Sequence, residues 1–204
     1  MQTIMIIDYG MGNLKSVEKA VEKIGAKPLV SSNPEFLTKA DKVILPGVGA
    51  FRDCINNLKK YHFTEAIKDY VKTGKLLLGI CLGMHVLLEK SYEFGEHKGL
   101  GLIAGEVIKF QDIGNLPVPH MGWNSINIKK ESRILSKIKS GDFFYFAHSY
   151  YVKPLYEADI LTTTDYGIEF TSSVNRENIF GVQFHPEKSQ EKGLQVLKNF
   201  VKEM

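Results

Sequence analysis

LLLGICLGMH (residues 76–85) is the most informative segment of the chain. The first five residues, Leu76 to Ile80, are almost wholly apolar, which predicts a strand buried on both faces at the centre of a parallel sheet. The run Gly79-Ile80-Cys81-Leu82-Gly83 then has the Gly-x-nucleophile-x-Gly form of a nucleophile elbow, in which glycines permit a sharp turn. Such a turn sets the Cys81 sulfur near the positive end of the following helix, which favours the thiolate. The alternative is a buried structural cysteine between two loop glycines.

The preceding residues alternate short apolar runs with stretches of helical period, which is typical of a parallel sheet flanked by helices. Thr3 to Ile7 is predicted to be a buried strand, followed by a helix that Asn13 can cap and Gly25 can end. The apolar face of this helix is expected to consist of Leu14, Val17, Val21 and Ile24. The next strands are expected at Leu29 with Val30 and at Val43 to Leu45, and a second helix at Ala66 to Val71.

From about Gly99 the sequence becomes richer in strands than in helices. The expected strands are Val107 to Phe110, Asn124 to Ile128, Phe143 to Ala147, Ile160 to Thr164 and Phe170 to Val174. We expect them to add antiparallel pairs to the parallel sheet before Ile179 to Phe184 rejoins its core and a last helix begins near Ser189. The prediction is an α/β protein forming a single domain over residues 1–204.

The composition is that of an ordinary globular domain, with 44% hydrophobic and 24% charged residues among 204. The formal charge of +3 comes from charges interspersed along the chain, so nucleic-acid binding is not indicated. The sequence has no long apolar run and no signal-peptide pattern, so we expect a cytoplasmic protein that does not enter a membrane. Two cysteines cannot make a disulfide framework, and Cys54 is expected to be a buried apolar residue.

A thiolate needs a base, and His185 is the best candidate among six histidines. It ends an apolar strand and is followed by Pro186 and Glu187, so that the Glu187 carboxylate can orient its imidazole from the same side of an extended segment. His85, four residues after Cys81, is the weaker alternative, because only Glu89 is placed to orient it. The scattered cysteines and histidines give no zinc-ligand spacing, so we expect no metal.

Attack on a carboxamide creates an oxyanion that preorganised donors must stabilise. The amide of Leu82, just after the nucleophile, is one expected donor. The loop Pro46-Gly47-Val48-Gly49 follows another strand and can supply a second from Val48 or Gly49 at the same sheet edge. This loop lacks the lysine and the serine or threonine of a phosphate-binding P-loop.

Six motifs together resemble the glutaminase subunits of imidazole glycerol phosphate synthase, within the triad-type (class I) glutamine amidotransferases. The resemblance covers nearly the whole chain, and the motifs that carry it are DYGMGN (8–13), LPGVGAF (45–51), GICLGM (79–84), PHMGWN (119–124), FAHSYY (146–151) and GVQFHPEKS (181–189). The resemblance implies a flavodoxin-like fold in which Cys81, His185 and Glu187 form a triad, and in which glutamine is hydrolysed through a thioester at Cys81. It implies no cofactor. Ammonia would pass through a (β/α)8-barrel cyclase partner, in a heterodimer, to make imidazole glycerol phosphate in histidine biosynthesis.

The resemblance also assigns roles to residues outside the triad. The residues that would line the L-glutamine site are Gly47, His85, Glu93, His148, Ser149 and Tyr150. Those that would face the partner are Asn13, Met121, Trp123, Tyr145 and Lys188. A core position is the alternative for Trp123.

His85 departs from the family pattern, which usually has a glutamine four residues after the nucleophile. A histidine can still donate a hydrogen bond, so glutaminase chemistry is retained. The departure leaves room for a paralogous subunit that supplies ammonia for amidation of a sugar acid or another metabolite. A free-standing Cys-His-Glu hydrolase and a non-catalytic binding module on the same scaffold are further alternatives.

Overall fold

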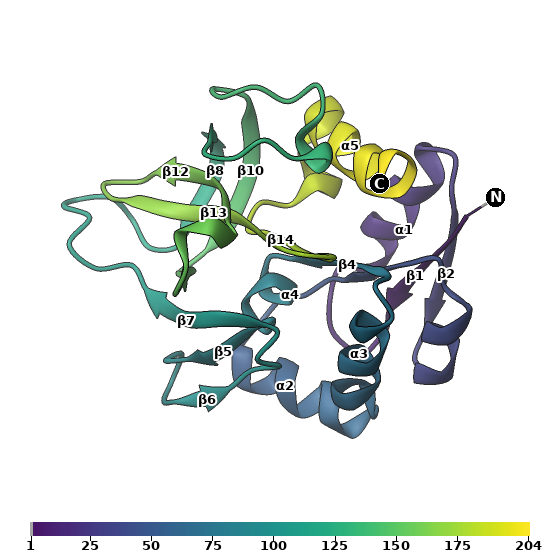
Figure 1. Cartoon of the computed structure of the whole chain (residues 1–204). Coiled ribbons are helices and arrows are strands. Elements are labelled where there is room, and N and C mark those ends of the chain that lie inside the picture. The colour runs from purple at the N-terminus through teal and green to yellow at the C-terminus, as the bar shows by residue number, and fades with distance from the viewer. Residues whose placement is uncertain (1) are drawn as a thin grey trace.

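A mixed twelve-stranded sheet runs through the computed structural model, which describes residues 2–204 (Figure 1). Its parallel half has the order β2-β1-β3-β4-β14, which is the 2-1-3-4-5 order of flavodoxin-like doubly wound sheets. These strands are β1 (Thr3–Ile7), β2 (Lys27–Ser31), β3 (Lys42–Leu45), β4 (Leu76–Ile80) and β14 (Ile179–Val182). The predicted fold class is confirmed.

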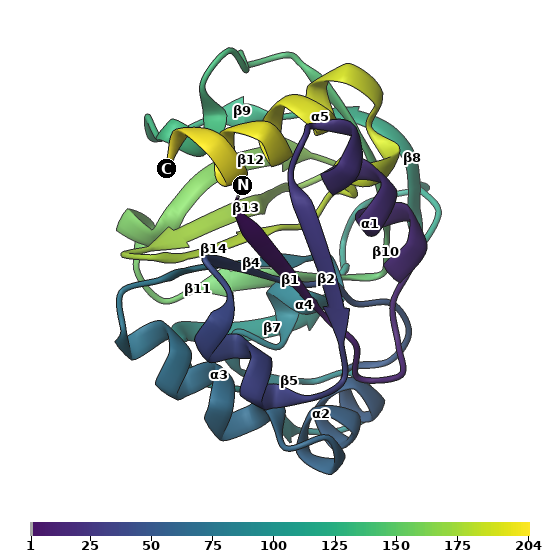
Figure 2. The same ribbon diagram turned by 90° about the vertical axis from the view of Figure 1, so that its right-hand side faces the viewer.

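Helices cover both faces of the parallel strands. Figures 1 and 2 show α1 (Leu14–Lys23) and α5 (Gln190–Lys198) on one face, and α2 (Phe51–Lys60) and α3 (Phe63–Lys72) on the other. The buried side chains fall into two clusters that correspond to these two faces. The strands between the two clusters, β1, β3, β4 and β14, are buried on each side, which explains why they are nearly continuous apolar runs.

The β4 strand lies in the middle of this half, paired in parallel with β3 and β14. Leu77 and Leu78 are fully buried, the first in the cluster under α2 and α3 and the second in the cluster under α1 and α5. This confirms the prediction from the apolar run. Because the carboxyl ends of parallel strands meet at one sheet edge, residues that follow β3, β4 and β14 are brought together there.

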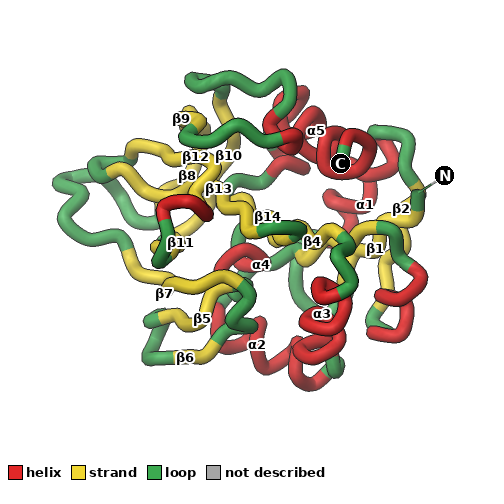
Figure 3. The backbone as a smooth tube through the Cα atoms, viewed as in Figure 1, coloured by secondary structure: helices red, strands yellow, loops and turns green. Residues whose placement is uncertain are grey.

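The second half of the chain extends the sheet with mostly antiparallel pairs. From β14 the order continues β13-β11-β7-β5-β6, and a branch runs from β13 to β12 and from β12 to β9 (Figure 3). The strands are β5 (Leu88–Ser91), β6 (His97–Lys98), β7 (Ile103–Lys109), β9 (Asn127–Ile128), β11 (Tyr150–Pro154), β12 (Ile160–Asp165) and β13 (Glu169–Arg176). Short 3-10 helices occupy Pro34–Lys39, Arg133–Leu135, Glu157–Asp159 and Pro186–Lys188.

One part of the strand-rich half does not join the main sheet. The strands β8 (His120–Ser125) and β10 (Phe143–His148) form a separate antiparallel pair. The expectation that all the later strands extend the parallel sheet is therefore wrong for these two. Their pairing gives one buried face, with Phe144, Phe146 and His148, and one face directed away from the core.

The last residues of the chain are anchored to the parallel sheet. The α5 helix continues into a π-helical segment, Asn199–Glu203, with Phe200 and Val201 buried. The buried ammonium of Lys42 on β3 donates to the carbonyl oxygens of Phe200, Val201 and Met204 at 2.9, 2.6 and 2.8 Å. These three acceptors compensate a buried charge, although burial still lowers the pKa of Lys42.

Candidate active site

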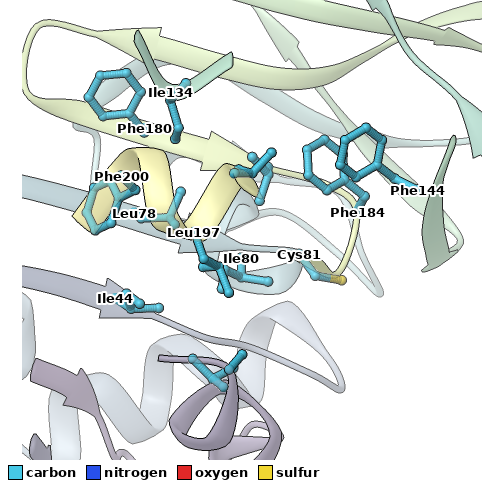
Figure 4. Packing of buried hydrophobic residues seen from close by; sticks show 14 of the residues in the cluster. Ile44, Leu78, Ile80, Cys81, Ile134, Phe144, Phe180, Phe184, Leu197 and Phe200 are labelled. Atoms are coloured by element: carbon cyan, nitrogen blue, oxygen red, sulfur yellow. The ribbon is translucent and has the colours of Figure 1, made fainter. Parts of the chain in front are cut away.

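Cys81 stands at the carboxyl end of β4, directly after the buried Ile80 (Figure 4). Its amide donates to the carbonyl of Val182 on β14 at 2.7 Å, so the residue remains tied to the sheet. Its backbone has φ 53° and ψ −113°, a conformation that non-glycine residues rarely adopt. The strain of the elbow is therefore carried by the nucleophile position itself.

The glycines of the elbow have a different purpose from the predicted one. Neither Gly79 nor Gly83 has a positive φ. A Cβ on Gly79 would lie 2.7 Å from the carbonyl carbon of Gly83, and a Cβ on Gly47 would lie 2.6 Å from the Gly83 nitrogen. These glycines are required because the backbone segments at Gly47, Gly79 and Gly83 approach too closely to leave room for a Cβ. The turn itself does not need glycine dihedral angles at Gly79 and Gly83.

The helix after Cys81 is only one turn long. α4 spans Leu82–His85, and the chain then returns as the strand β5. A single turn has few aligned peptide dipoles, so the expected support of a thiolate by a helix end is small. The positive charge near the sulfur must come from a side chain.

His185 supplies a basic group at this point, because it follows the end of β14, the parallel neighbour of β4. Its Nδ1 lies 2.9 Å from Oε1 of Glu187, and both side chains are almost fully buried. Burial alone would disfavour the imidazolium, but the adjacent Cys81 sulfur and the Glu187 carboxylate outweigh it and raise the pKa of His185 to about 10. Within residues 2–204 Oε2 of Glu187 has no hydrogen-bond partner, so the carboxylate is directed at the imidazole alone.

His85 is hydrogen-bonded to Gln183 and, within residues 2–204, makes no hydrogen bond to the Cys81 sulfur. It is 5% exposed, and its Nε2 lies 2.7 Å from Oε1 of Gln183. Burial lowers the pKa of His85 to about 4, only partly offset by that hydrogen bond. Glu89, its expected carboxylate partner, is exposed and accepts from the Gly105 amide instead. An imidazole with so low a pKa and no orienting carboxylate is a weak general base, which favours His185.

The loop at Pro46–Gly49 lies against the Leu82–Gly83 segment. A Cβ on Gly47 would lie 2.8 Å from Cβ of Leu82, and Gly49 has φ +92°. Val48, Gly49, Leu82 and the Cys81 sulfur border the same cavity. In the described part of the chain, the amides of Val48 and Leu82 donate to no protein acceptor, so they are free for a bound group.

The cavity has a volume of about 330 Å³, at the lower end for small-molecule sites. It is lined by Val48, Gly49, Cys81, Leu82, His85, Glu93, Pro119, Met121, Ala147, His148, Ser149, Tyr150, His185 and Lys188. Every predicted glutamine-site residue except Gly47 borders it; Gly47 is buried just beneath. One oxygen of Glu93 accepts from the Phe51 amide at 2.6 Å, and burial raises the pKa of this carboxyl despite that bond.

A chain of hydrogen bonds behind the cavity was not foreseen from the sequence. The amide nitrogen of Asn124 donates to Nε2 of His120, Nδ1 of His120 lies 3.0 Å from Nε2 of His148, and Nδ1 of His148 lies 2.9 Å from the Tyr150 carbonyl. Because Asn124 is the donor at one end and a carbonyl the acceptor at the other, each imidazole carries one proton, on Nδ1. Burial lowers the pKa of both histidines, in accord with neutral rings.

The outward face of the β8–β10 pair carries most of the residues predicted to meet a partner. Met121 and Trp123 are 64% and 47% exposed, so the core position for Trp123 is wrong. Trp123 packs edge-on against Tyr145, and the ammonium of Lys188 lies 5.7 Å from the centre of the Tyr145 ring. Asn13 is placed apart from this group, at the start of α1, and its side chain makes no capping hydrogen bond, contrary to expectation.

Over residues 2–204, no group of three or more histidine, cysteine or acidic side chains is arranged to hold a metal ion. None of the helices in that range is both long and apolar enough to cross a membrane. The second cysteine, Cys54, is fully buried, with its sulfur 3.4 Å from the Tyr9 hydroxyl, and burial raises its pKa to about 12. Cys81 is therefore the cysteine suited to nucleophilic chemistry.

Comparison with known proteins links this geometry to a family. The model of the family "Glutamine amidotransferase class-I" matches residues 5–204. The imidazole glycerol phosphate synthase subunit HisH of Aquifex aeolicus (strain VF5) is 52% identical over 201 residues, covering 98% of this chain and 96% of the relative. The protein of that name from Syntrophotalea carbinolica is 50% identical, covering 97% and 98%. Among solved structures, PurLQS from Thermotoga maritima superposes with a TM-score of 0.79 at 18% identity, covering 100% of this chain and 99% of that one, which shows the shared fold.

Proposed function

The chain belongs to the class-I glutamine amidotransferases, as a subunit of the imidazole glycerol phosphate synthase type, and from that premise we propose how its own residues hydrolyse glutamine. The observation that carries the proposal is that Cys81 and His185, from two neighbouring strands, line one cavity, with the Glu187 carboxylate on the far nitrogen of the His185 ring. The proposed products are glutamate and ammonia, and the ammonia is delivered to a separate synthase subunit.

In the proposed mechanism the Cys81 thiolate attacks the side-chain carboxamide carbon of glutamine. The oxyanion that forms is stabilised by the amides of Leu82 and of Val48 or Gly49, and each such donor lowers the barrier by roughly 3 kcal/mol. The imidazolium of His185 gives its proton to the departing ammonia, which leaves a thioester at Cys81. Water activated by His185 then hydrolyses the thioester, and Glu187 holds the imidazole in place through both steps.

The remaining cavity residues are proposed to hold the glutamine. Glu93 has one oxygen on the Phe51 amide and can direct the other to the α-ammonium group. The segment from His148 to Tyr150 offers backbone groups, and the hydrogen bond from His148 to the Tyr150 carbonyl keeps that segment in shape. His85 borders the same cavity and is proposed to contact the substrate through its remaining ring edge.

The partner is proposed to be a (β/α)8-barrel cyclase that forms a heterodimer with this chain and makes imidazole glycerol phosphate. An exposed aromatic group with methionine and lysine, at the mouth of the cavity, suits such an interface. Met121, Trp123, Tyr145 and Lys188 would form its centre, with Asn13 at its margin. The Tyr145 carbonyl accepts the His185 amide at 2.9 Å, so binding at this face reaches the triad directly.

The proposal is tested by measuring glutamate release by the full chain, alone and with a cognate cyclase and its nucleotide ligand. We expect stimulation by the partner and a trapped thioester at Cys81 that Cys81→Ser abolishes. His185→Ala should abolish hydrolysis, whereas His85→Gln should still hydrolyse glutamine. The reverse result for the two histidines would contradict the base assignment.

Each remaining outcome excludes a different part of the proposal. Absence of stimulation by a cyclase would contradict this acceptor and favour a subunit that serves sugar-acid amidation. Full turnover by the isolated chain, unaffected by added proteins, would favour a free-standing hydrolase. If Cys81→Ala left the activity of the protein unchanged, the proposed nucleophilic chemistry at Cys81 would be contradicted.

A further inference from the structure

Gln183 lies between His85 and the Cys81 sulfur and is fully buried. Its Oε1 is 2.7 Å from Nε2 of His85, and its Nε2 is 3.7 Å from the sulfur. It follows the last residue of β14, two positions before His185, so both side chains leave the same side of an extended segment. Phe184 between them points the other way and packs on Phe144 (Figure 4). The sulfur is thus approached by two polar side chains from one strand end.

The orientation of the Gln183 amide depends on the proton of His85. A neutral imidazole carries a single proton, and a proton on Nε2 of His85 requires an oxygen opposite it. The amide must then present its NH2 group to the sulfur. With the amide reversed, a carbonyl oxygen would face the thiolate and repel it, and His85 would lose its acceptor. With its proton on Nε2, which is the tautomer that the inference takes, His85 selects this one of the two amide orientations.

We propose that Gln183 is a catalytic residue that donates an N–H to the Cys81 thiolate, and that His85 is the positioning residue that keeps this donor on the sulfur. The inference rests on the proposed role of Cys81 as nucleophile. A hydrogen bond to a charged acceptor is stronger than one to a neutral acceptor, so the interaction favours the thiolate over the thiol. His185 then supports the same charge from its own side of the sulfur.

Two titratable groups beside this arrangement, Tyr9 and His148, stay neutral over the working range. Burial raises the pKa of Tyr9, which lies near the sulfur and donates to the Pro46 carbonyl. Burial lowers the pKa of His148, which faces His85 and His185. Glu187 is held behind His185 as its partner. A change in the pH dependence of Cys81 reactivity therefore reports on the donors that touch it.

The test is the rate of Cys81 alkylation by iodoacetamide in the full-length chain, followed by mass spectrometry between about pH 5.5 and 9.5. The variants are Gln183→Met, which removes the donor at similar volume, and His85→Met, which releases the amide. His85→Gln is the matched control, because a glutamine amide can still donate to Oε1 of Gln183. Cys81→Ser reports any background from the buried Cys54.

We expect Gln183→Met and His85→Met to move the alkylation midpoint upward by about one pH unit, equivalent to about tenfold slower alkylation near pH 6.5. His85→Gln should keep the midpoint of the unmodified chain. If Gln183 only filled space, a methionine of similar volume would leave the pH midpoint of alkylation unchanged. The midpoint therefore distinguishes a hydrogen-bond donor from a side chain with a purely structural role. An unshifted midpoint in both methionine variants would overturn the inference while leaving the nucleophile in place.

Two further outcomes are decisive. If Gln183→Met does not fold, as judged by thermal unfolding, the comparison of His85→Met with His85→Gln decides, and equal midpoints in these two overturn the inference. If Cys81 in the unmodified chain alkylates only at alkaline pH, like an ordinary thiol, the proposed function fails first and the inference fails with it.

Discussion

Replacing His85 with glutamine should make the protein less sensitive to mild acid. His85 is 5% exposed, and burial lowers its pKa in the folded chain to about 4 from the ordinary 6.5. As the pH falls below 6.5 the unfolded chain takes up a proton at this position, but the folded chain does not. Folding is therefore penalised progressively until the pH reaches the folded pKa, where the penalty levels off.

The size of the effect follows from these two pKa values. At about pH 5 the unfolded state is favoured by its protonation by a factor of roughly 30, which is about 2 kcal/mol. At about pH 7.5 the same contribution is close to zero, because the side chain is neutral in both states. The His85→Gln chain lacks this titrating imidazole and keeps a hydrogen-bond donor for Gln183. Between about pH 7.5 and about pH 5 its free energy of unfolding should therefore fall by about 2 kcal/mol less than that of the unmodified chain.

Urea unfolding of both chains at the two pH values measures the difference directly. Every other titrating group, including His120 and the carboxylates, is present in both proteins and cancels in the comparison. Equal losses of stability in the two chains would refute the reasoning, because they would mean that folded His85 accepts a proton as readily as unfolded His85.

Three further substitutions test other parts of the structure. Glu187→Gln removes the charge that supports the imidazolium, so hydrolysis should fall by about a hundredfold or more and the pKa of His185, read from the pH–rate profile, should drop; an unchanged profile would contradict its orienting role. Gly83→Ala would push a Cβ into the Leu45 carbonyl and should lower the melting temperature; a stability equal to that of the unmodified chain would contradict the close packing at the elbow. Trp123→Ala should weaken cyclase binding by about tenfold or more in calorimetry while leaving the melting temperature nearly unchanged, because the side chain is 47% exposed; undiminished binding would place the interface elsewhere.

The sequence predicts the parallel half of the fold well, because β1, β3, β4 and β14 are buried on both faces and leave a clear apolar signal. Leu76 to Ile80 is a strand with the predicted bounds. The helix at Phe51–Lys60 was missed, although Phe51, Cys54, Ile55 and Leu58 repeat at helical spacing and form its buried side. The sequence therefore contains the signal for this helix, directly after the glycine-rich loop.

Contacts between strands distant in the sequence are harder to predict. The separation of β8 and β10 from the main sheet depends on tertiary packing, which strand propensity does not contain. The hydrogen bonds that link His120 to His148 and His85 to Gln183 join residues 28 and 98 positions apart. Cys81 and His185 meet at one sheet edge as predicted, with Glu187 behind His185, while the roles assigned to these three residues and to the cavity lining remain predictions.

The Lys42 anchor has a consequence for how the protein can be handled. β3 carries Lys42 at one end and runs at the other into the Pro46–Gly49 loop, so the final residues are fastened to the same strand that presents the loop to the cavity. Removing residues 200–204 would strip a buried ammonium of all three of its acceptors. Truncation at the carboxyl end should therefore disturb the loop at the cavity and harm catalysis at a distance.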